Sequence, residues 1–395
     1  MKTLADFALD ADQQMIRESA EAFLAENCSS EAVRRAMESE LGYDPALWRR
    51  IGAELGWCAT AIPERHGGLG LSWIELTLLM ERMGQRLLCS PYLATVCLAA
   101  SALLEAGGEA GQARYLPAIA DGGLTATLAL ADRGVEWKPE ALSCRATARD
   151  GGFVLDGAFR HVPDGAHAQL LLVPAWLDGE LALFALDGDT AGVRRREHAN
   201  IDRTRRVAEI RVEGAAVPAD ALLARGPAVA VGLARAAALA AIALAAEQLG
   251  GAQQCLDLTL TYTAERVQFG RTVNSFQAVK HRCAEMMVRI EAARSAVYGA
   301  ARVASAGADT GALLLEAACV KAFASEAFYF CAQEAIQLHG GVGFTWEYDP
   351  QLYFKRAQAG SQWLGSIDGM RERAAAALLD HGADHGARNM EEQHA

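Results

Sequence analysis

The spacing of apolar residues changes twice along this chain, and that change limits the folds open to it. Up to about residue 120, apolar side chains recur every three or four residues, as on one face of a helix. Between about residues 121 and 226, short apolar runs alternate with Asp-Gly and Gly-Gly turns, which is typical of strands. Helical spacing then returns. Because helices and strands do not alternate, the sequence excludes a doubly wound fold and predicts an α+β architecture.

The same pattern predicts where the parts of the chain begin and end. A polar stretch without apolar spacing closes the sequence, and His381 and His385 within it are expected to be solvated, so we predict no metal site. Gly250 and Gly251 interrupt a helical pattern that continues on both sides, which indicates close packing rather than a break. We expect an N-terminal α-helical domain over residues 1–120, a middle β-barrel or sheet domain over 121–226, a C-terminal four-helix-bundle domain over 227–380 and a disordered tail over 381–395.

Composition excludes several classes of function. The 395 residues include 37 basic and 49 acidic side chains, a formal net charge of −12, so the chain lacks the basic surface that nucleic-acid binding requires. Nine cysteines without a CxxC pair indicate reduced thiols and predict a cytoplasmic location. The apolar stretch 228–246 is rich in alanine and contains Arg235, which would cost about 3 kcal/mol at a bilayer centre. We therefore expect a buried helix there and no membrane span.

One segment suggests contact with a nucleotide. No GxGxxG loop follows a strand and no Walker sequence is present, so any nucleotide must be held in another way. Residues 266–270 read RVQFG at the end of a predicted helix, and Gln277 follows. A guanidinium beside an apolar ring and an amide can contact a diphosphate and a purine. A helix–helix turn with a surface arginine explains the same spacing.

A second segment is rich in glycine. Residues 337–348 read QLHGGVGFTWEY, with three glycines in four positions after a predicted helix. Such a turn lets the backbone approach a ligand and exposes amide donors. A helix C-cap followed by an ordinary turn is the alternative interpretation.

Together with residues 62–72 (IPERHGGLGLS) and 81–84 (ERMG), these segments have the order and spacing of the acyl-CoA dehydrogenase family, which the chain resembles over residues 10–380. The resemblance implies the family's fold, with helices, a β-barrel-like middle domain and a helical bundle. It also implies FAD bound without covalent attachment near a dimer interface. The resemblance implies that Arg266 contacts the pyrophosphate of FAD and that Phe269 and Gln277 contact its adenosine half. It also implies that residues of a neighbouring subunit reach the adenosine, namely Gln337, Gly340, Gly341 and Gly343. Ser366 is a further implied cofactor contact.

The resemblance also implies a reaction, and the sequence departs from it at the base. Family members remove the proton α to an acyl-CoA thioester and pass a hydride from the β carbon to the flavin. This needs a carboxylate base in a dry pocket, where burial raises its pKa. The two positions at which the family carries that base are occupied here by Leu364, in a segment that reads WLGS, and by Ala240. Neither side chain can take a proton.

Glu247 is the candidate substitute for the missing base. It follows Ala240 by seven residues, so it shares that face of the predicted helix and lies about 10 Å further along the axis. An acid in this apolar stretch must be partnered or protonated. A buried glutamate held by hydrogen bonds for packing is the alternative.

The middle domain departs from the family as well. Residues 128–134 read LALADRG where the family carries a Thr-Glu-Pro and Gly-Ser-Asp pattern, and residues 161–165 read HVPDG where it carries Trp-Ile-Thr or Trp-Ile-Ser over the flavin ring. Flavin-ring contacts are therefore more in doubt than adenosine contacts. Six arginines, at positions 194–196, 203, 205 and 206, can meet CoA phosphates or simply face solvent.

Three interpretations remain open at this point. The chain is an active FAD-dependent dehydrogenase of a bulky or unusual acyl-CoA, as a homotetramer that passes electrons to an electron-transfer flavoprotein. Alternatively, it is a catalytically silent subunit of a heteromeric α2β2 enzyme, as in bacterial relatives that act on steroid side chains, and completes its partner's FAD site. The third interpretation is a flavin oxidase or monooxygenase of the same superfamily.

Overall fold

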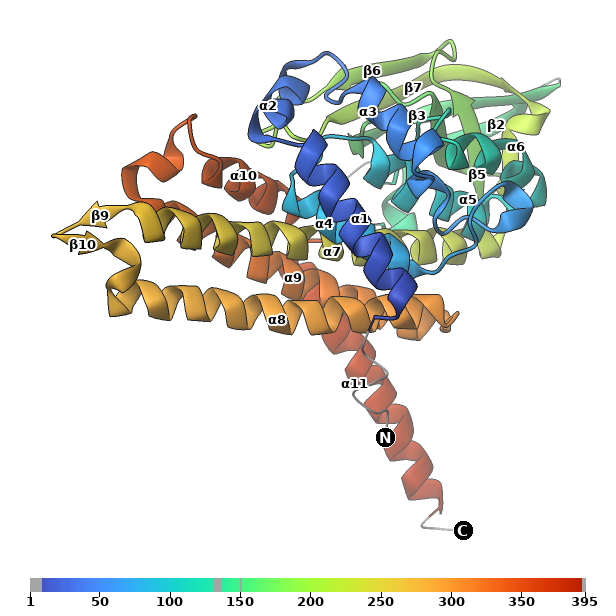
Figure 1. Cartoon of the computed structure of the whole chain (residues 1–395). Helices are drawn as coiled ribbons and strands as arrows, with labels where there is room; N and C mark the ends of the chain where they lie inside the picture. The colour runs from blue at the N-terminus through green and yellow to red at the C-terminus, as the bar shows by residue number, and fades with distance from the viewer. Residues whose placement is uncertain (1–8, 131–136, 150, 393–395) are drawn as a thin grey trace.

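The structure, a computed structural model, describes residues 9–130, 137–149 and 151–392. As the spacing predicts, helices come first, a mixed sheet follows and a helical bundle completes the chain (Figure 1). A π-helical stretch, Leu93–Ala100, leads into the fifth helix of the first part. The helices of this N-terminal part are α1 (Ala11–Asn27), α2 (Ser30–Glu38), α3 (Pro45–Arg49), α4 (Trp73–Gln85), α5 (Ser101–Ala106) and α6 (Gly108–Ala120).

The middle part is a mixed sheet. Its strands are β1 (Ala126–Leu128), β2 (Arg145–Arg149), β3 (Gly152–Pro163), β4 (Leu170–Leu177), β5 (Glu180–Asp187), β6 (Val193–Glu197), β7 (Val207–Pro218) and β8 (Leu222–Arg225). They follow the order β6-β7-β3-β2-β4-β5-β8, with β1 beside β4. β4 runs parallel to β1 and β2, and the other pairs are antiparallel. The arginine-rich β6 pairs its side chains with glutamates of β7 (Arg194 with Glu213, Arg196 with Glu209), so these arginines are not free for phosphates.

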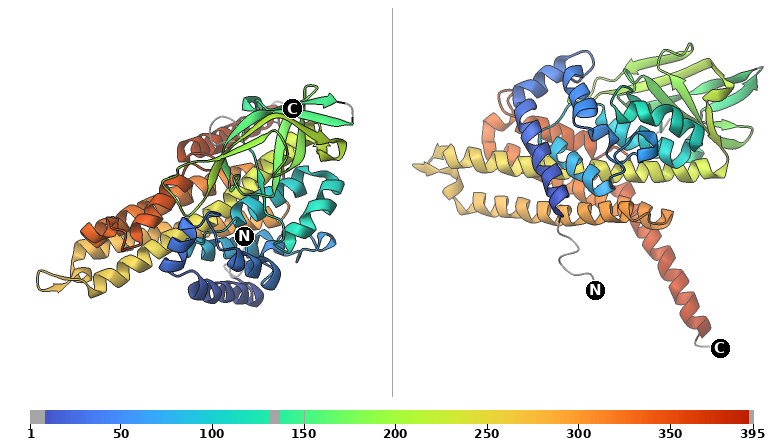
Figure 2. Two further views of the ribbon diagram at one scale, coloured as in Figure 1. Left: turned by 90° about the horizontal axis from the view of Figure 1, so that it is seen from above. Right: turned by 45° about the vertical axis from the view of Figure 1, so that its right-hand side comes forward.

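The C-terminal part is a bundle of long helices. Its elements are α7 (Pro227–Glu265), the hairpin β9 (Val267–Gln268) and β10 (Arg271–Thr272), α8 (Gln277–Ser305), α9 (Thr310–His339), α10 (Pro350–Gly360) and α11 (Ile367–Glu392). In the views of Figures 1 and 2 the hairpin lies at one end of α7 and the sheet lies toward the other. α7 is long and apolar enough to cross a membrane, but it is largely buried among its neighbours, as the predicted core helix would be.

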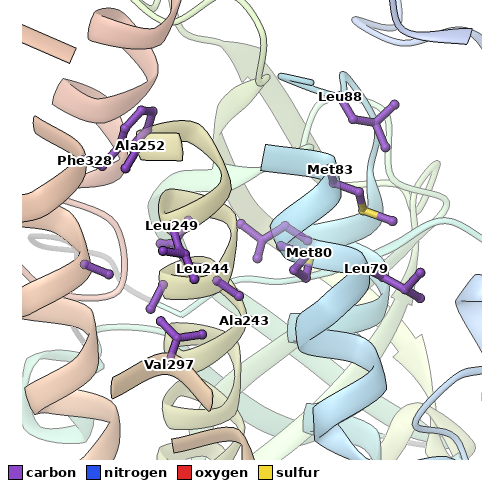
Figure 3. Packing of buried hydrophobic residues seen from close by; sticks show 14 of the residues in the cluster. Leu79, Met80, Met83, Leu88, Ala243, Leu244, Leu249, Ala252, Val297 and Phe328 are labelled. Carbon is purple, nitrogen blue, oxygen red and sulfur yellow. The ribbon is translucent and has the colours of Figure 1, made fainter. Parts of the chain in front are cut away.

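Close helix packing in the core depends on glycine. A Cβ added to Gly250 would lie 1.8 Å from the carbonyl oxygen of Glu81 on α4, and one added to Gly84 would lie 1.9 Å from that of Glu247 on α7. The two glycines therefore let α4 and α7 touch backbone to backbone, which confirms Gly250 as a packing point. Apolar side chains from α4, α7, α8 and α9 fill the rest of this core (Figure 3).

The end of the chain differs from the expectation. α11 continues through Glu392, and its later part extends away from the body (Figures 1 and 2), where the sequence predicts a disordered tail over 381–395. Residues 393–395, and residues 131–134 of the departing LALADRG segment, lie outside the described residues. The domain boundaries stay predictions; β1 begins six residues after α6 ends, and α7 begins two residues after β8 ends.

Candidate functional site

Two cavities meet at the loop formed by residues 361–366, which we call the Leu364 loop. Leu364 lines both of them. The wider cavity, of about 550 Å³, lies between helices of the bundle and falls in the size range of small-molecule sites, ~300–1,000 Å³. It is lined by Trp137, Lys138, Pro139, Glu140, Ala230, Ala234, Ala237, Ala238, Ala241, Gly311, Leu314, Leu315, Ala317, Ala318, Leu364, Met370, Arg373, Ala376 and Ala377.

The wall of the wider cavity is made of small apolar side chains. Five alanines of α7 recur every three or four residues and so form one stripe along that helix, and α9 adds Gly311, Ala317 and Ala318. Small residues on facing helices leave a wide, apolar space between them. Glu140 is the one carboxylic acid among the lining residues that the structure describes, and it is exposed. The cavity can therefore accept a bulky apolar group but presents no buried base to it.

The second cavity is on the side of the loop that faces the sheet, and it is small. Its volume is about 40 Å³, and it is lined by Leu98, Leu128, Leu130, Arg160, His161, Pro163, Trp363 and Leu364. Each ordered water needs about 10–15 Å³ of such volume, so the space suits about three waters. It is far too small for a three-ring group. Leu128 and Leu130 of the first departing segment, and His161 and Pro163 of the second, are among its lining residues.

Buried contacts hold the Leu364 loop in place. The Lys321 ammonium on α9 is fully buried and donates to Ser325 Oγ at 2.8 Å and to the backbone carbonyl oxygens of Ser361 and Gly365 at 3.5 and 3.4 Å. Burial lowers the pKa of Lys321 to about 7. Leu364 itself adopts a left-handed backbone with a φ of 58°. This conformation is unfavourable for a leucine, so the surrounding contacts must maintain it.

Glu247 lies in a buried ion-pair network rather than in either cavity. Its Oε2 accepts from Arg205, and its Oε1 accepts from Arg356 Nη1 at 2.5 Å. Arg356 also contacts Asp202 at 3.0 Å and donates from Nε to Thr204 Oγ1 at 2.8 Å. All of these side chains are buried. The network continues toward the loop because the Arg205 guanidinium carbon lies 4.9 Å from the centre of the Trp363 ring.

These contacts argue against Glu247 as the base. Burial by itself raises the pKa of this carboxyl group, but Arg205 and Arg356 outweigh burial and hold the pKa below its usual value. A carboxylate with both oxygens in ion pairs is a weak proton acceptor. Ala240 is fully buried within the apolar core. The geometry therefore favours the alternative, a structural glutamate, and leaves both of the family's base positions without an acid.

At the hairpin end of the bundle, the predicted nucleotide residues are exposed. Phe269 is 91% exposed because Phe269 and Gly270, with φ of 53° and 75°, form the two-residue turn between β9 and β10. Arg266 precedes this hairpin and Gln277 opens α8; both are exposed. The predicted residues thus sit on one projecting edge rather than in the protein interior.

The glycine segment lies at the same end of the same chain. Tyr262 near the end of α7 stacks on His339 at the end of α9, with ring centroids 4.4 Å apart. Gln337, Gly340 and Gly341 are exposed, and a Cβ added to Gly340 or Gly341 would meet nothing within 4 Å. Gly343, by contrast, is buried against Ile336 and His339. We call this region, residues 262–277 and 337–348, the nucleotide end.

Ser366 lies apart from the nucleotide end. Its hydroxyl oxygen accepts from the backbone N–H of Gly369 at 3.1 Å, and its carbonyl accepts from Met370. It therefore caps the start of α11, and its contact with a cofactor stays a prediction.

Helices around a mixed sheet, an apolar cavity at the junction and exposed segments at 262–277 and 337–348 form the arrangement that the resemblance to acyl-CoA dehydrogenases predicts. Comparison with protein families agrees. Residues 10–123 match the acyl-CoA dehydrogenase N-terminal domain, and residues 232–379 match the acyl-CoA dehydrogenase C-terminal domain. The chain belongs to the acyl-CoA dehydrogenase family.

Individual members of the family and solved structures are similar to this chain over most of its length. The chain is 36% identical over 357 residues to the acyl-CoA dehydrogenase IpdE2 of Mycolicibacterium smegmatis, covering 90% of this chain and 96% of that protein. Among solved structures, it is similar to a chain of the ChsE4–ChsE5 complex from Mycobacterium tuberculosis, with a TM-score of 0.84, 27% identity and coverage of 94% and 98%. It is also similar to a chain of the Tcur3481–Tcur3483 steroid acyl-CoA dehydrogenase variant, with a TM-score of 0.83, 29% identity and coverage of 94% and 99%.

The family binds FAD, and the residues of this chain fit only one half of it. The open glycine turn and the exposed Arg266, Phe269 and Gln277 suit the pyrophosphate and adenosine half, because backbone and side-chain donors are uncovered there. Among the described residues, the cavity beside Leu364 on the sheet side is about 40 Å³, which does not hold the three-ring half. The described residues thus offer FAD an exposed surface that suits its nucleotide half and a cavity too small for its ring half.

Proposed function

We propose that this chain is the base-free subunit of a heteromeric FAD-dependent acyl-CoA dehydrogenase, with α2β2 composition. The observation that carries the proposal is the set of residues at the proton-transfer positions: Leu364 and Ala240 where the base belongs, and Glu247 held in two ion pairs. A homologous chain then supplies the carboxylate that removes the α proton. FAD, when bound, accepts the hydride from the β carbon.

In this proposal the chain acts through its nucleotide end. Arg266 would hold the pyrophosphate, while Phe269, Gln277, Gln337, Gly340 and Gly341 would hold the adenosine half of an FAD whose ring lies in the partner. The exposure of this end supports a protein neighbour as well. Phe269, Phe344 and Trp346 are 91%, 69% and 56% exposed, and such gathered apolar surface is typical of an interface.

The acyl group is inferred from the wider cavity. Its alanine-lined walls and volume of about 550 Å³ suit a bulky, rigid, apolar acyl chain such as a fused-ring system. The steroid acyl-CoA dehydrogenase among the structural relatives supports the same substrate class. We further propose that the enzyme is cytoplasmic and passes its electrons to an electron-transfer flavoprotein.

Co-expression tests the proposal. The chain is purified alone and together with homologous acyl-CoA dehydrogenase chains from the same organism, and the visible spectrum of each preparation is recorded. We expect a colourless single chain and a yellow complex with one FAD for each pair of unlike chains, bleached anaerobically by a ring-bearing acyl-CoA. A single chain that is yellow and bleaches without a partner would contradict the proposal and restore the homotetrameric dehydrogenase.

A further inference from the structure

Two basic side chains line the small cavity on the sheet side of the Leu364 loop. Arg160 and His161 both line that cavity, together with apolar side chains such as Leu128 and Leu130. The ring of His198 packs against the ring of His161, with ring centroids 5.6 Å apart. Neither the proposed nucleotide surface nor the acyl cavity uses these three residues, so their arrangement needs its own explanation.

A β-bulge turns Arg160 and His161 into the cavity. On β3, Phe159 pairs with Ile210 and Val162 pairs with Ala208, so the two residues between them face the single residue Glu209 of β7. His161 takes a left-handed backbone with a φ of 56° as a result. Bulges of this kind re-aim side chains and are common beside functional sites. The bulge thus exposes two cationic side chains that a regular strand would place on opposite faces.

Basic side chains around this cavity outnumber the carboxylates that could pair with them. In the part of the chain that the structure describes, the side chains of Arg160 and His161 make no hydrogen bond or ion pair, and His198 Nε2 is buried without a hydrogen-bond partner. The nearby carboxylate, Glu209, is already held by Arg196 at 2.6 Å and Arg211 at 3.0 Å. Burial and then the neighbouring His161, Arg196 and Arg160 lower the pKa of His198. Arg196 and Arg211 therefore already occupy Glu209, and Arg160 is left without a carboxylate partner among the described residues.

We propose that this cavity is a binding site for a small carboxylate with a short apolar tail. The carboxylate would lie against Arg160 and His161, since a hydrogen bond from a guanidinium to a carboxylate is charge-assisted and strong. The tail would contact Leu128 and Leu130. A volume of about 40 Å³, enough for about three waters, limits the ligand to a few non-hydrogen atoms. The site is the same small cavity that does not hold the flavin ring. Its residues all belong to this chain, so the site does not depend on the proposed partner subunit.

Ligand-observed NMR on the full chain tests the site with propionate as the probe and inorganic phosphate as a comparison. At about pH 6 we expect saturable propionate binding, with the Arg160 guanidinium as the charged partner of the carboxylate. Arg160→Gln and His161→Asn should each weaken binding about tenfold, and asparagine tolerates the left-handed backbone at position 161. Arg149→Gln, an exposed arginine on β2, is the matched control and should bind as the unaltered chain does.

The outcomes separate the possibilities. Propionate binding that is lost in the Arg160 and His161 variants but kept in the Arg149 control would support the site. Propionate binding that does not saturate, or that the two variants leave unchanged, would overturn it. Phosphate binding as tight as propionate binding would overturn the apolar-tailed class, because only charge would then be recognised. A single chain that is yellow and active would refute the proposed function, and the propionate-binding measurement would still decide whether the carboxylate site exists.

Discussion

The nucleotide end and the Leu364 loop lie in the same bundle, yet they differ in what they retain of the family. The nucleotide end keeps the arginine, aromatic and glycine positions of the family and holds them exposed, with Phe269 at the tip of a hairpin. At the Leu364 loop a leucine stands where the family is expected to carry its base, the cavity on the sheet side is about 40 Å³, and Glu247 is held between Arg205 and Arg356.

In the proposed heteromeric enzyme, this difference separates the parts of the fold that a neighbouring chain uses from the parts that it does not use. A surface that another chain uses must keep its chemistry, whereas a reaction centre that the chain itself does not use is free to become core. Fold therefore does not decide function here, and the residues at the site do. Each prediction below tests one side of this contrast, beginning with the largest effect.

Glu247→Gln should be the most damaging change at the loop side. It leaves Arg205 and Arg356 buried with less negative charge to oppose them, and removing one partner of a buried ion pair costs about 3–5 kcal/mol. Urea unfolding of the full chain measures this loss in the free energy of unfolding. Glu326→Gln is the matched control, because the Glu326–Arg371 pair is about half exposed and should contribute at most about 1 kcal/mol.

The pH dependence of that loss has a fixed sign. The pKa of Glu247 lies below its usual value of 4.5, so the ion pairs stabilise the fold above that pH and stop doing so as the pH falls through the folded-state pKa. The gap between the unaltered chain and the variant should therefore close on acidification. A Glu247→Gln variant of unchanged stability would mean that the network is not structural and would reopen its role as a base.

Asp164→Asn should act in the opposite direction. Asp164 is buried, its Oδ2 has no hydrogen-bond partner among the described residues, and burial raises its pKa from 3.8 to about 7. Because the folded state holds this proton more tightly than the unfolded state, stability is lost as the pH rises from about 4 to about 7. The loss over three pKa units is at most about 4 kcal/mol.

The amide variant removes that cost, so its gain in the free energy of unfolding should grow with pH and vanish below about pH 4. Thermal unfolding across this pH range is the measurement. Asp178→Asn serves as a control, since Asp178 also has a left-handed backbone, with a φ of 49°, but is exposed in a turn. A constant gain at all pH values would contradict the assignment of the raised pKa to Asp164.

Arg266→Ala tests the nucleotide end in the co-expressed complex. A charge-assisted hydrogen bond to phosphate contributes about 1.5–3 kcal/mol, so the dissociation constant of FAD should rise roughly 10- to 100-fold. Stability of the chain should not change, because Arg266 is exposed. Arg49→Ala, an exposed arginine on α3, should leave FAD retention as it was. Unaltered FAD affinity in the Arg266 variant would remove this end from the cofactor site.

Apolar spacing was enough to predict the order of the three parts, but not every element within them. The sequence does not predict β2 and β6, because Arg145–Arg149 has no large apolar residue and Val193–Glu197 carries charges on both faces. The arginines of β6 are explained by β7, whose glutamates pair with two of them. The continuation of α11 through Glu392 was missed because that stretch has no apolar face to show.

The candidate site divides in the same way. Family motifs predict the nucleotide end and predict that Leu364 and Ala240 stand at the positions of the base. They could not reveal the partners of Glu247, since Arg205 lies 42 residues before it and Arg356 lies 109 residues after it. Lys321 was equally invisible, because a lysine in an alanine-rich helix gives no sign that the fold will bury it against the Leu364 loop.

Leu364→Glu restores an acid at one of the base positions and should have the smallest effect on function. The new carboxyl group would face the wider cavity, where an apolar environment raises its pKa as a base requires. Even so, we expect the single chain to show no flavin bleaching with an acyl-CoA, because the sheet-side cavity still excludes the ring. Anaerobic titration followed in the visible spectrum is the measurement. Bleaching in this variant would show that the ring pocket opens when FAD arrives, and that the base alone separates this chain from an active dehydrogenase.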